Sequence, residues 1–531
     1  MKVWVLMALM CAAVGLGAHD SGGISGLSAP NYSDALAKSI LFFEGQRSGR
    51  LPANQRVTWR GNSAVYDGQA EGVNLTGGYY DAGDNVKFGF PMAFSVSLLS
   101  WSALEFRDEV SAAGQLLYLR SAIQWGAYFL LRAHTSPTTL YTQVGDGNAD
   151  HQCWERPEDM DTPRTLYKIT ASSPGSEAAG EAAAALAAAY LVFKDDPDKT
   201  LATQLLAASR SLFDFANNYR GSFQSSCPFY CSYSGYQDEL QWAAAWLYRA
   251  TRDRKYFDYL QNNQGGSSNT FRWQFKHVQL GQQVSWSSDA CNTGVLVGWK
   301  VRAAKLQEGP GLLCLRRDAQ QRQHADTHNS WRASVYKRYS QYAVHDDHSP
   351  AAVHLLKDPE VFKHQRSPVQ WSKIHARSDQ FLRSITGRHT SCSHMSLGFC
   401  QIALCNIRHA CDLQVDYILG ENPLAMSYMV GYGSKFPRRI HHRGASIPSI
   451  KALPRKVTCV EGFSSWFPTT NSNPNYHIGA IVGGPDENDK FNDDRGDSAH
   501  SEPTTYINAA FVGACAAALR RSVGNITSVT I

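Results

Sequence analysis

The strongest chemical signal in the sequence is a pair of carboxylates inside a glycine-rich turn. Asp81 and Asp84 lie three residues apart in the run Gly77–Asn85. Paired glycines let the backbone turn tightly, so that both carboxylates can point to one site. Such a pair can hold one water molecule, with one carboxylate accepting its proton while the other orients it. Like charge raises the pKa of one member. On spacing alone, a solvated turn or a calcium site explains the pair at least as well.

A third candidate carboxylate, Glu502, follows an acidic cluster at Asp486–Asp494. Pro503 is typical of the first turn of a helix, so the sequence predicts Glu502 at the start of a closing helix. A helix N-terminus lowers the pKa of a carboxyl group, whereas a general acid must keep its proton near neutral pH. Burial against aromatic rings such as Tyr506, together with the nearby aspartates, would have to outweigh the helix. The alternative is that Glu502 is only a helix-start charge.

Histidine, arginine and aromatic side chains supply the remaining candidates. His441 and His442 are adjacent and face different ways on most backbones, so we expect no metal site that uses both. His441 and Arg443 suit hydrogen bonds to sugar hydroxyls or to the aspartates. Aromatic rings in predicted loops suit the apolar face of a sugar, although buried packing explains each of them equally well. These rings are Trp154, Phe229, Tyr230 and Tyr233.

The N-terminus predicts secretion. Met1 and Lys2 precede an apolar run to Leu16, which is too short to span a membrane, so we expect a signal peptide at 1–18. No later run of 18 apolar residues follows, and the remainder, 19–531, is expected to carry no membrane anchor. Glycosylation sequons at Asn31, Asn74 and Asn525 are typical of a secreted glycoprotein.

Charge and cysteine spacing exclude several classes of protein. A formal net charge of +5, with no basic run interleaved with aromatics, argues against a nucleic-acid partner. Cys227 and Cys231 lack a second ligand pair at zinc-site spacing, so disulfides or free thiols are favoured over a metal. The segment Asp146–Asp150 resembles the start of a calcium loop, but His151 stands where that loop needs glycine, and we reject it.

Helical periodicity dominates the chain, and alternating strand patterns are scarce. The sequence therefore predicts a single all-α domain with long functional loops. Ser33 is expected to cap the first helix. The predicted helices are Ser33–Gly45, Phe94–Phe106, Leu116–Ala133, Gly175–Phe193, Thr200–Tyr219, Asp238–Thr251 and Pro503–Leu519.

The region Ser287–Cys411 departs from this pattern. Ten of the 18 histidines lie between His324 and His409, and polar stretches such as Arg316–His324 are typical of solvated loop. A structureless stretch of this length is uncommon inside a compact domain. Two interpretations stay open, a divergent insertion or a gene-model error through a wrong frame or mis-spliced exon, and we favour the second.

Taken together, these motifs resemble glycoside hydrolase family 9, in particular its plant-type secreted endo-β-1,4-glucanases. The motifs occur in the family's order and cover roughly residues 30–285 and 412–520, leaving the region Ser287–Cys411 as the departure. The matching segments are Gly77–Asp84, Cys153–Arg164, Tyr236–Leu240, His441–Arg443 and Asp486–Ala510.

The resemblance implies an (α/α)6 toroid, a six-hairpin barrel with an open cleft for a glucan chain. It implies Asp84 as the base that activates water, Asp81 as its partner and Glu502 as the acid on the glycosidic oxygen. Inversion then requires roughly 6.5–9.5 Å between the two carboxyl groups. The resemblance adds His441 and Asp493 to the catalytic set. It assigns substrate contacts to Arg443, His151, Trp154, Phe229, Tyr230, Tyr233 and Tyr506.

The expected function is therefore hydrolysis of a cellulose-like β-1,4-glucan by a secreted monomer of the cell wall or apoplast, without cofactor or metal. Mixed-linkage glucan and glucomannan stay open as related substrates. The alternative from another class is a non-catalytic or impaired glucan-binding member of the family. Intact Asp81, Asp84 and Glu502 argue against it, because a binding module does not need both an acid and a base.

Overall fold

The computed structural model describes residues 30–263 except 234, the strand pairs 271–272 and 281–282, and residues 414–527 except 487. All of these belong to one compact unit, formed by residues 1–300 and 368–531. The second unit, residues 301–367, lies outside the described residues. So do the predicted signal peptide at 1–18 and the irregular region 287–411.

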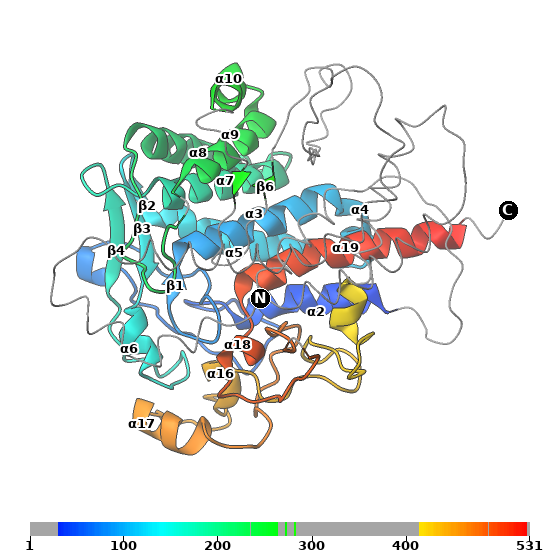
Figure 1. The fold of residues 1–531 in the computed structure, drawn as a ribbon. Coiled ribbons are helices and arrows are strands. Elements are labelled where there is room, and N and C mark those ends of the chain that lie inside the picture. The colour runs from blue at the N-terminus through cyan, green and yellow to red at the C-terminus, as the bar shows by residue number, and fades with distance from the viewer. Residues whose placement is uncertain are drawn as a thin grey trace, which may run out of the picture. The chain divides into compact units, whose positions relative to one another are not determined.

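The described chain is mainly helical, which confirms the predicted all-α class (Figure 1). The long helices are α2 (Tyr32–Gly45), α3 (Gly89–Glu105), α5 (Leu116–Ala133), α7 (Ser176–Phe193), α8 (Thr200–Asn218), α9 (Gln237–Thr251) and α19 (Thr505–Thr527). The shorter ones are α4 (Arg107–Ala112), α6 (Gly147–His151), α10 (Arg254–Asn262), α16 (Arg443–Ser446), α17 (Cys459–Glu461) and α18 (Ser498–Ser501), with helical turns at Gln69–Glu71 and Gly462–Trp466.

The predicted bounds are right for α5, whereas the starts of three helices are wrong. One of these is α3, which begins at Gly89 rather than at Phe94. The first helix is capped by Asn31 rather than Ser33, because the Asn31 side chain accepts a hydrogen bond from the Asp34 amide at 3.0 Å. The closing helix begins at Thr505 rather than at Pro503. Glu502 instead follows α18 with an extended backbone, so it does not lie in the first turn of α19.

A small antiparallel sheet was not predicted. Its strands are β1 (Lys87–Phe88), β2 (His134–Ser136), β3 (Thr139–Val144) and β4 (Leu166–Thr170), and β3 pairs with each of the others. A further pair, β5 (Phe271–Arg272) with β6 (Gly281–Gln282), lies apart from it. Strands this short give too few alternations to be read from sequence. The sheet matters for the site because β1 directly follows the loop that carries Asp81 and Asp84.

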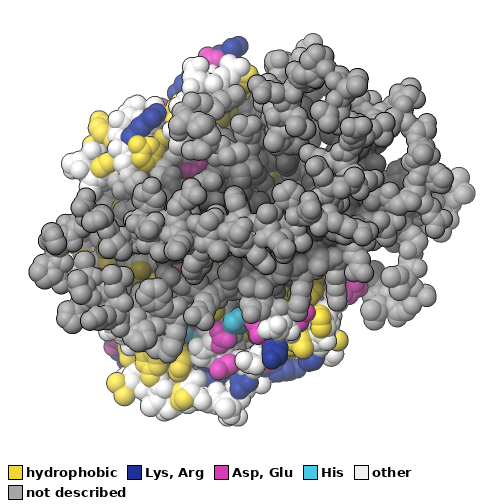
Figure 2. Space-filling view, in the orientation of Figure 1, with side chains coloured by type: hydrophobic (Ala, Val, Ile, Leu, Met, Phe, Trp, Pro, Cys, Tyr) yellow, Lys and Arg dark blue, Asp and Glu magenta, His cyan; other side chains and the backbone are white. Residues whose placement is uncertain are grey.

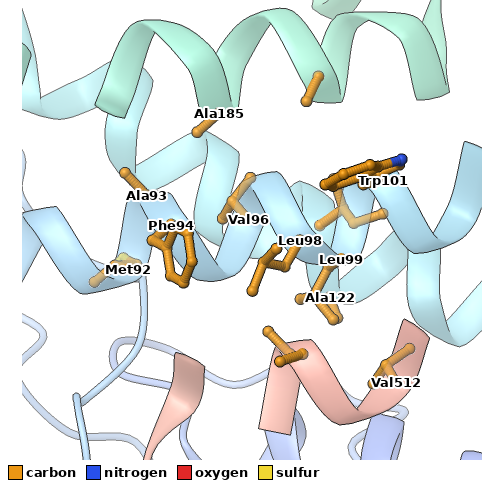
Figure 3. Close-up of a cluster of buried hydrophobic side chains, with 14 of the residues drawn as sticks. Met92, Ala93, Phe94, Val96, Leu98, Leu99, Trp101, Ala122, Ala185 and Val512 are labelled. Atoms are coloured by element: carbon orange, nitrogen blue, oxygen red, sulfur yellow. The ribbon is translucent and has the colours of Figure 1, made fainter. Parts of the chain in front are cut away.

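The hydrophobic core is built around α3, which packs between α7 and α19 (Figures 1 and 3). Figure 3 shows Leu98 and Leu99 of α3 between Ala185 of α7 and Val512 of α19. Nearly every residue of α7 is buried, and half are alanine, so neighbouring helices can approach its backbone closely. This burial on all sides explains why apolar residues surround the helix rather than lining one face of it.

On the face drawn in Figure 2, Lys and Arg side chains of the described residues lie among Asp, Glu and hydrophobic side chains. That mixture agrees with the balanced charge of the sequence. Among the described helices, none is both long and apolar enough to cross a bilayer.

The core makes a direct stability prediction. Leu99 has an exposed fraction of 0%, so Leu99→Ala leaves a cavity and should lower the free energy of unfolding by about 2–5 kcal/mol. Leu117 of α5 is 79% exposed, and Leu117→Ala should change it by less than about 0.5 kcal/mol. Denaturant titration of both variants measures the difference. Equal losses would contradict the packing described for α3.

Candidate active site

The loop that carries Asp81 and Asp84 is held at both ends. Gly77 and Gly78 precede it with φ values of 85° and 73°, which side chains rarely tolerate. Within the loop, the Asp81 amide donates to the Val86 carbonyl at 3.1 Å, and the Thr505 amide donates to the Asp81 carbonyl at 2.9 Å. The loop is thus tied to β1 on one side and to the start of α19 on the other.

Gly83 brings the third carboxylate to this loop. Its amide donates to Glu502 Oε1 at 3.0 Å across 419 residues of sequence. A Cβ at position 83 would lie 2.1 Å from the His441 carbonyl oxygen, so only glycine permits this approach. The structure therefore brings together the three carboxylates that the sequence singled out as acid and base.

Burial controls the charge of these three groups. Loss of solvent raises the pKa of Glu502 to about 7, against the Gly83 amide and the Arg443 charge, which lower it. Burial, followed by the charge of Asp150, also raises the pKa of Asp84 to about 7. The pKa of Asp81 lies well above its usual value, again through burial and then through the Asp84 charge. Glu502 lies outside the closing helix, and the backbone amide that lowers its pKa is that of Gly83.

Tyr230 and Tyr506 contribute ring and hydroxyl groups to the same site. The Tyr230 hydroxyl donates to Asp81 Oδ2, which lowers the pKa of that carboxyl group against the effect of burial. The Tyr230 ring is 4.9 Å from the ring of Phe88. Tyr506 follows Thr505 in the first turn of α19 and borders the same cavity as Asp81.

Arg443 joins the loops around the carboxylates. Its exposed fraction is 2%, and its guanidinium donates to the carbonyls of Cys153, Gly83 and Asp150 at 2.9–3.1 Å. It also forms a 3.1 Å ion pair with the Asp150 carboxylate. Arg443 therefore holds these loops together, and its charge lowers the pKa of both Asp84 and Glu502.

His441 and Trp154 pack beside Arg443. Burial and the Arg443 charge lower the pKa of His441 to about 3, so its ring is neutral and its Nδ1 donates to the Arg495 carbonyl at 2.7 Å. The Trp154 ring lies 4.8 Å from the His441 ring. Trp154 is 1% exposed, and its indole donates to Ser446 Oγ at 2.9 Å.

Asp493 shapes the segment that leads to His441. Its carboxylate accepts hydrogen bonds from the backbone amides of Arg438 and Arg439 at 2.9–3.0 Å. Its own backbone has a φ of 45°, an uncommon value outside glycine. In the structure, Asp493 therefore braces the chain two residues before the histidine.

A cavity of about 320 Å³ opens onto the carboxylates. Of the predicted site residues, its walls contain Asp81, Asp84, His151, Phe229, Tyr230, Tyr233, Glu502 and Tyr506. Trp154, His441, Arg443 and Asp493 lie outside this lining. Phe229 is set in place by Gly147, where a Cβ would meet its ring at 2.4 Å, and by the His151 ring at 4.6 Å.

Other lining residues were not anticipated. Phe88, Phe90 and Phe94 come from β1 and α3, and Phe223 precedes the Phe229 loop. In sequence they look like ordinary apolar positions of core elements. No local signal separates a ring that faces a cavity from a ring that faces the core.

A second set of carboxylates lines the cavity from α7 and α9. Burial raises the pKa of Glu177 to about 7 and that of Glu239 well above its usual value, with Asp238 raising Glu239 further. Glu177 Oε2 and Glu239 Oε2 find no hydrogen-bond partner among the described residues. Burial therefore favours the protonated forms of both carboxyl groups, which reduces the negative charge of this part of the wall.

Two groups of described residues place three metal-type side chains together. In Asp84, Asp150 and His151, the Arg443 guanidinium already neutralises Asp150. In Cys153, Glu155 and Cys459, the two sulfurs are joined as a disulfide. Neither donor set is open to a cation in this arrangement, and we assign a metal to neither. Cys227 and Cys231 also form a disulfide, whereas Cys515 is a buried free thiol.

An acid and a base of raised pKa beside aromatic faces are the groups that cleavage of a glycosidic bond requires. The family model for glycosyl hydrolase family 9 matches residues 32–515. Endoglucanase 20 of Oryza sativa subsp. japonica is 59% identical over 94% of this chain and 90% of its own length. An endoglucanase of Phaseolus vulgaris is 50% identical over 97% of this chain and 98% of its own.

The solved structure of an endoglucanase from the termite Nasutitermes takasagoensis aligns with a TM-score of 0.65 at 35% identity, covering 94% of this chain and all of that one. The chain belongs to glycosyl hydrolase family 9. This membership confirms the resemblance drawn from the sequence motifs, and with it the (α/α)6 barrel as the fold class.

The Tyr230 contact makes a pH prediction. Its hydroxyl favours the ionised form of Asp81, so Tyr230→Phe raises the pKa of that carboxyl group. The acid limb of kcat/KM should then move to higher pH by about one unit. Tyr141→Phe, which removes a hydroxyl bonded to the distant Glu71, should leave the limb in place. An unmoved limb in Tyr230→Phe would show that Asp81 ionisation does not limit the rate.

Proposed function

We propose that the chain is an endo-β-1,4-glucanase that hydrolyses internal bonds of a cellulose-like glucan with inversion at the anomeric carbon. The observation that carries the proposal is the hydrogen bond from the Gly83 amide to Glu502. It brings a carboxyl group from the C-terminal segment against the loop of Asp81 and Asp84. Both Glu502 and Asp84 have a pKa of about 7, as an acid and a base working near neutral pH require.

In the proposed reaction, Glu502 donates its proton to the glycosidic oxygen as the bond to the anomeric carbon breaks. A water molecule held by Asp81 and Asp84 attacks that carbon from the opposite face and gives its proton to Asp84. The charges of Asp84 and Glu502 repel each other, so these two groups together keep one proton over a range of pH. Activity should rise as the coupled carboxyl groups of Asp81 and Asp84 ionise and fall as Glu502 loses its proton.

The cavity walls support a glucan as the substrate. The rings of Phe229, Tyr230, Tyr233 and Tyr506 offer apolar faces for sugar rings, and His151 adds a polar edge. Family members have been solved with cello-oligosaccharides, among them Cel9M of C. cellulolyticum with cellobiose, at 28% identity and a TM-score of 0.61. CelQ of Clostridium thermocellum has been solved with cellotriose, at 27% identity and a TM-score of 0.59.

We assign supporting roles at this site to the predicted residues outside the cavity lining. Arg443 balances the carboxylates and joins their loops, and His441 packs between Trp154 and the Glu502 segment, donating its backbone amide to the Ser501 carbonyl at 3.1 Å. Asp493 holds the backbone leading to His441. The direct sugar contacts that the resemblance implies for Trp154 and Arg443 stay predictions.

The non-catalytic alternative gains no observation in its favour. A protein that only binds glucan needs the aromatic walls. It does not need two carboxyl groups of raised pKa, such as Glu502 and Asp84, beside each other at the Gly83 amide. Glucomannan and mixed-linkage glucan would present the same ring faces, and a substrate series separates them from cellulose.

We also propose that the protein is secreted to the cell wall as a monomer, with residues 1–18 removed and the catalytic domain spanning 19–531. The sequon residues Asn31 and Asn74 are exposed, and the two disulfides found among the described residues suit an oxidising compartment. When the chain is expressed in a eukaryotic secretory host, the protein in the medium should lack residues 1–18. N-terminal sequencing should then begin at His19. A product retained in the cell with Met1 in place would contradict secretion.

Substrates with different leaving groups distinguish the acid role of Glu502 from the base role of Asp84. Glu502→Gln should lower kcat on a soluble cellulose derivative by about 10²–10⁴-fold. It should keep most of its rate on an aryl cellobioside whose phenolate departs without a proton, and there the alkaline limb of the pH profile should disappear. Asp84→Asn should lose activity on both substrates, because both need the activated water.

Asp258→Asn, an exposed change on α10, is the matched control and should behave as the parent enzyme. Proton NMR of the first product should show the α-anomer. A folded parent that releases no reducing sugar would overturn the enzyme assignment, and a β-anomer would overturn inversion alone.

A further inference from the structure

The Gln46 side chain, one residue after α2, contacts the backbone on both sides of Asp81. Its Nε2 donates to the Ala82 carbonyl at 2.7 Å and to the Tyr80 carbonyl at 3.3 Å. The Gln46 backbone carbonyl accepts from the Tyr80 amide at 3.0 Å. Gln46 is 1% exposed, so these bonds are not shared with solvent. Three bonds from one residue thus bracket the catalytic aspartate.

Two buried histidines hold the other end of this amide. Gln46 Oε1 lies 2.8 Å from His442 Nε2 and 3.1 Å from His477 Nε2. The two carbonyls opposite only accept hydrogen bonds, so the amide nitrogen must face them and the amide oxygen must face the imidazoles. Both imidazoles must then carry their proton on Nε2. For His442 this agrees with Nδ1, which accepts from the Ala445 amide at 3.0 Å.

The surroundings keep both imidazoles neutral. Burial, with the Arg60 charge nearby, lowers the pKa of His477 to about 3. Burial and the neighbouring His477 lower the pKa of His442 well below its usual value. The Phe42 ring stacks on His477 at 4.6 Å, and a Cβ on Gly45 would meet that imidazole at 2.3 Å. The rings therefore have one protonation state and little room to turn.

Arg443, the residue after His442, also binds the backbone of this loop. Arg443 donates both its amide and its guanidinium to the Gly83 carbonyl, at 3.0 and 3.1 Å. The carbonyls of residues 80, 82 and 83 are thus all bound by Gln46 or Arg443. Asp81 and Asp84 project from this stretch, and the Gly83 amide within it binds Glu502.

We propose that Gln46 is a positioning residue for catalysis, which sets the placement of Asp81 and Asp84 through the carbonyls of Tyr80 and Ala82, with His442 and His477 fixing the orientation of its amide. This inference rests on the hydrolase function proposed above. It explains why a fully hydrogen-bonded amide occupies a buried position beside the catalytic loop, where an apolar side chain would satisfy packing alone.

Gln46→Glu is the sharpest test, because it keeps the shape and replaces the two N–H donors with a carboxylate oxygen facing two carbonyls. Displacement of the loop that carries Asp81 and Asp84 should lower kcat on a soluble cellulose derivative by about 100-fold. This is the scale expected when reacting groups are misplaced by about 1 Å. The inhibition constant of cellobiose should stay within about twofold, because the aromatic walls come from other elements.

Gln55→Glu is the matched control. Gln55 is also an amide that donates to a backbone carbonyl, that of Glu44 at 2.6 Å, and accepts from Arg47 at 2.7 Å, but it has no contact with residues 80–84. Its kcat should equal that of the parent. Gln46→Met, which removes the amide without adding charge, should reproduce the loss of kcat if Gln46→Glu is poorly folded.

The parent enzyme in the same assay tests the proposed function separately, since an inactive parent would reject that function whatever the variants do. An active parent with unchanged kcat in Gln46→Glu or Gln46→Met would overturn the positioning role. So would unfolding of both variants, or a weakening of cellobiose binding equal to the loss of kcat, because either result would mean that Gln46 supports the fold as a whole.

Discussion

The hydrogen bond between the Gly83 amide and Glu502 joins segments 419 residues apart, and the chemistry of the site depends on it. Gly83 can make this bond only because it has no side chain, since the His441 carbonyl occupies the space of a Cβ. The bond places Glu502, the proposed proton donor, against the turn that carries both aspartates. The backbone on either side of this turn is held by hydrogen bonds to the residue before β1 and to the start of α19.

Burying three carboxyl groups in one place disfavours their ionised forms. Desolvation and mutual repulsion raise their pKa values, so that protons are retained near neutral pH. Arg443 offsets part of the repulsion while joining the loops, and His441 stays neutral beside it. In the proposed mechanism, the site therefore holds an acid and a base whose pKa values suit proton transfer.

The support beneath the carboxylates is made of neutral polar groups. The Gln46 amide accepts hydrogen bonds from His442 and His477 and, in our proposal, fixes the turn of Asp81 and Asp84 through its carbonyls. A charged group in this place would shift the pKa values of the nearby carboxylates, whereas a neutral network orients the turn and leaves their charge balance to Arg443 and solvent exclusion. Gln46 and the two histidines thus contribute to the geometry of the site alone, whereas Arg443 contributes to both its geometry and its charge balance.

Periodicity and long ordered motifs are local properties of the chain, so the helical class, most helix bounds, the family and the three carboxylates could be predicted from them. The place of Glu502 relative to the closing helix could not, because it depends on the turn made after α18. The tertiary structure also decided that Phe88 and Phe94 face a cavity while Trp154 is enclosed. The role of Gln46 was likewise absent from any local pattern, since its partners lie 34–431 residues away and meet only when the chain folds.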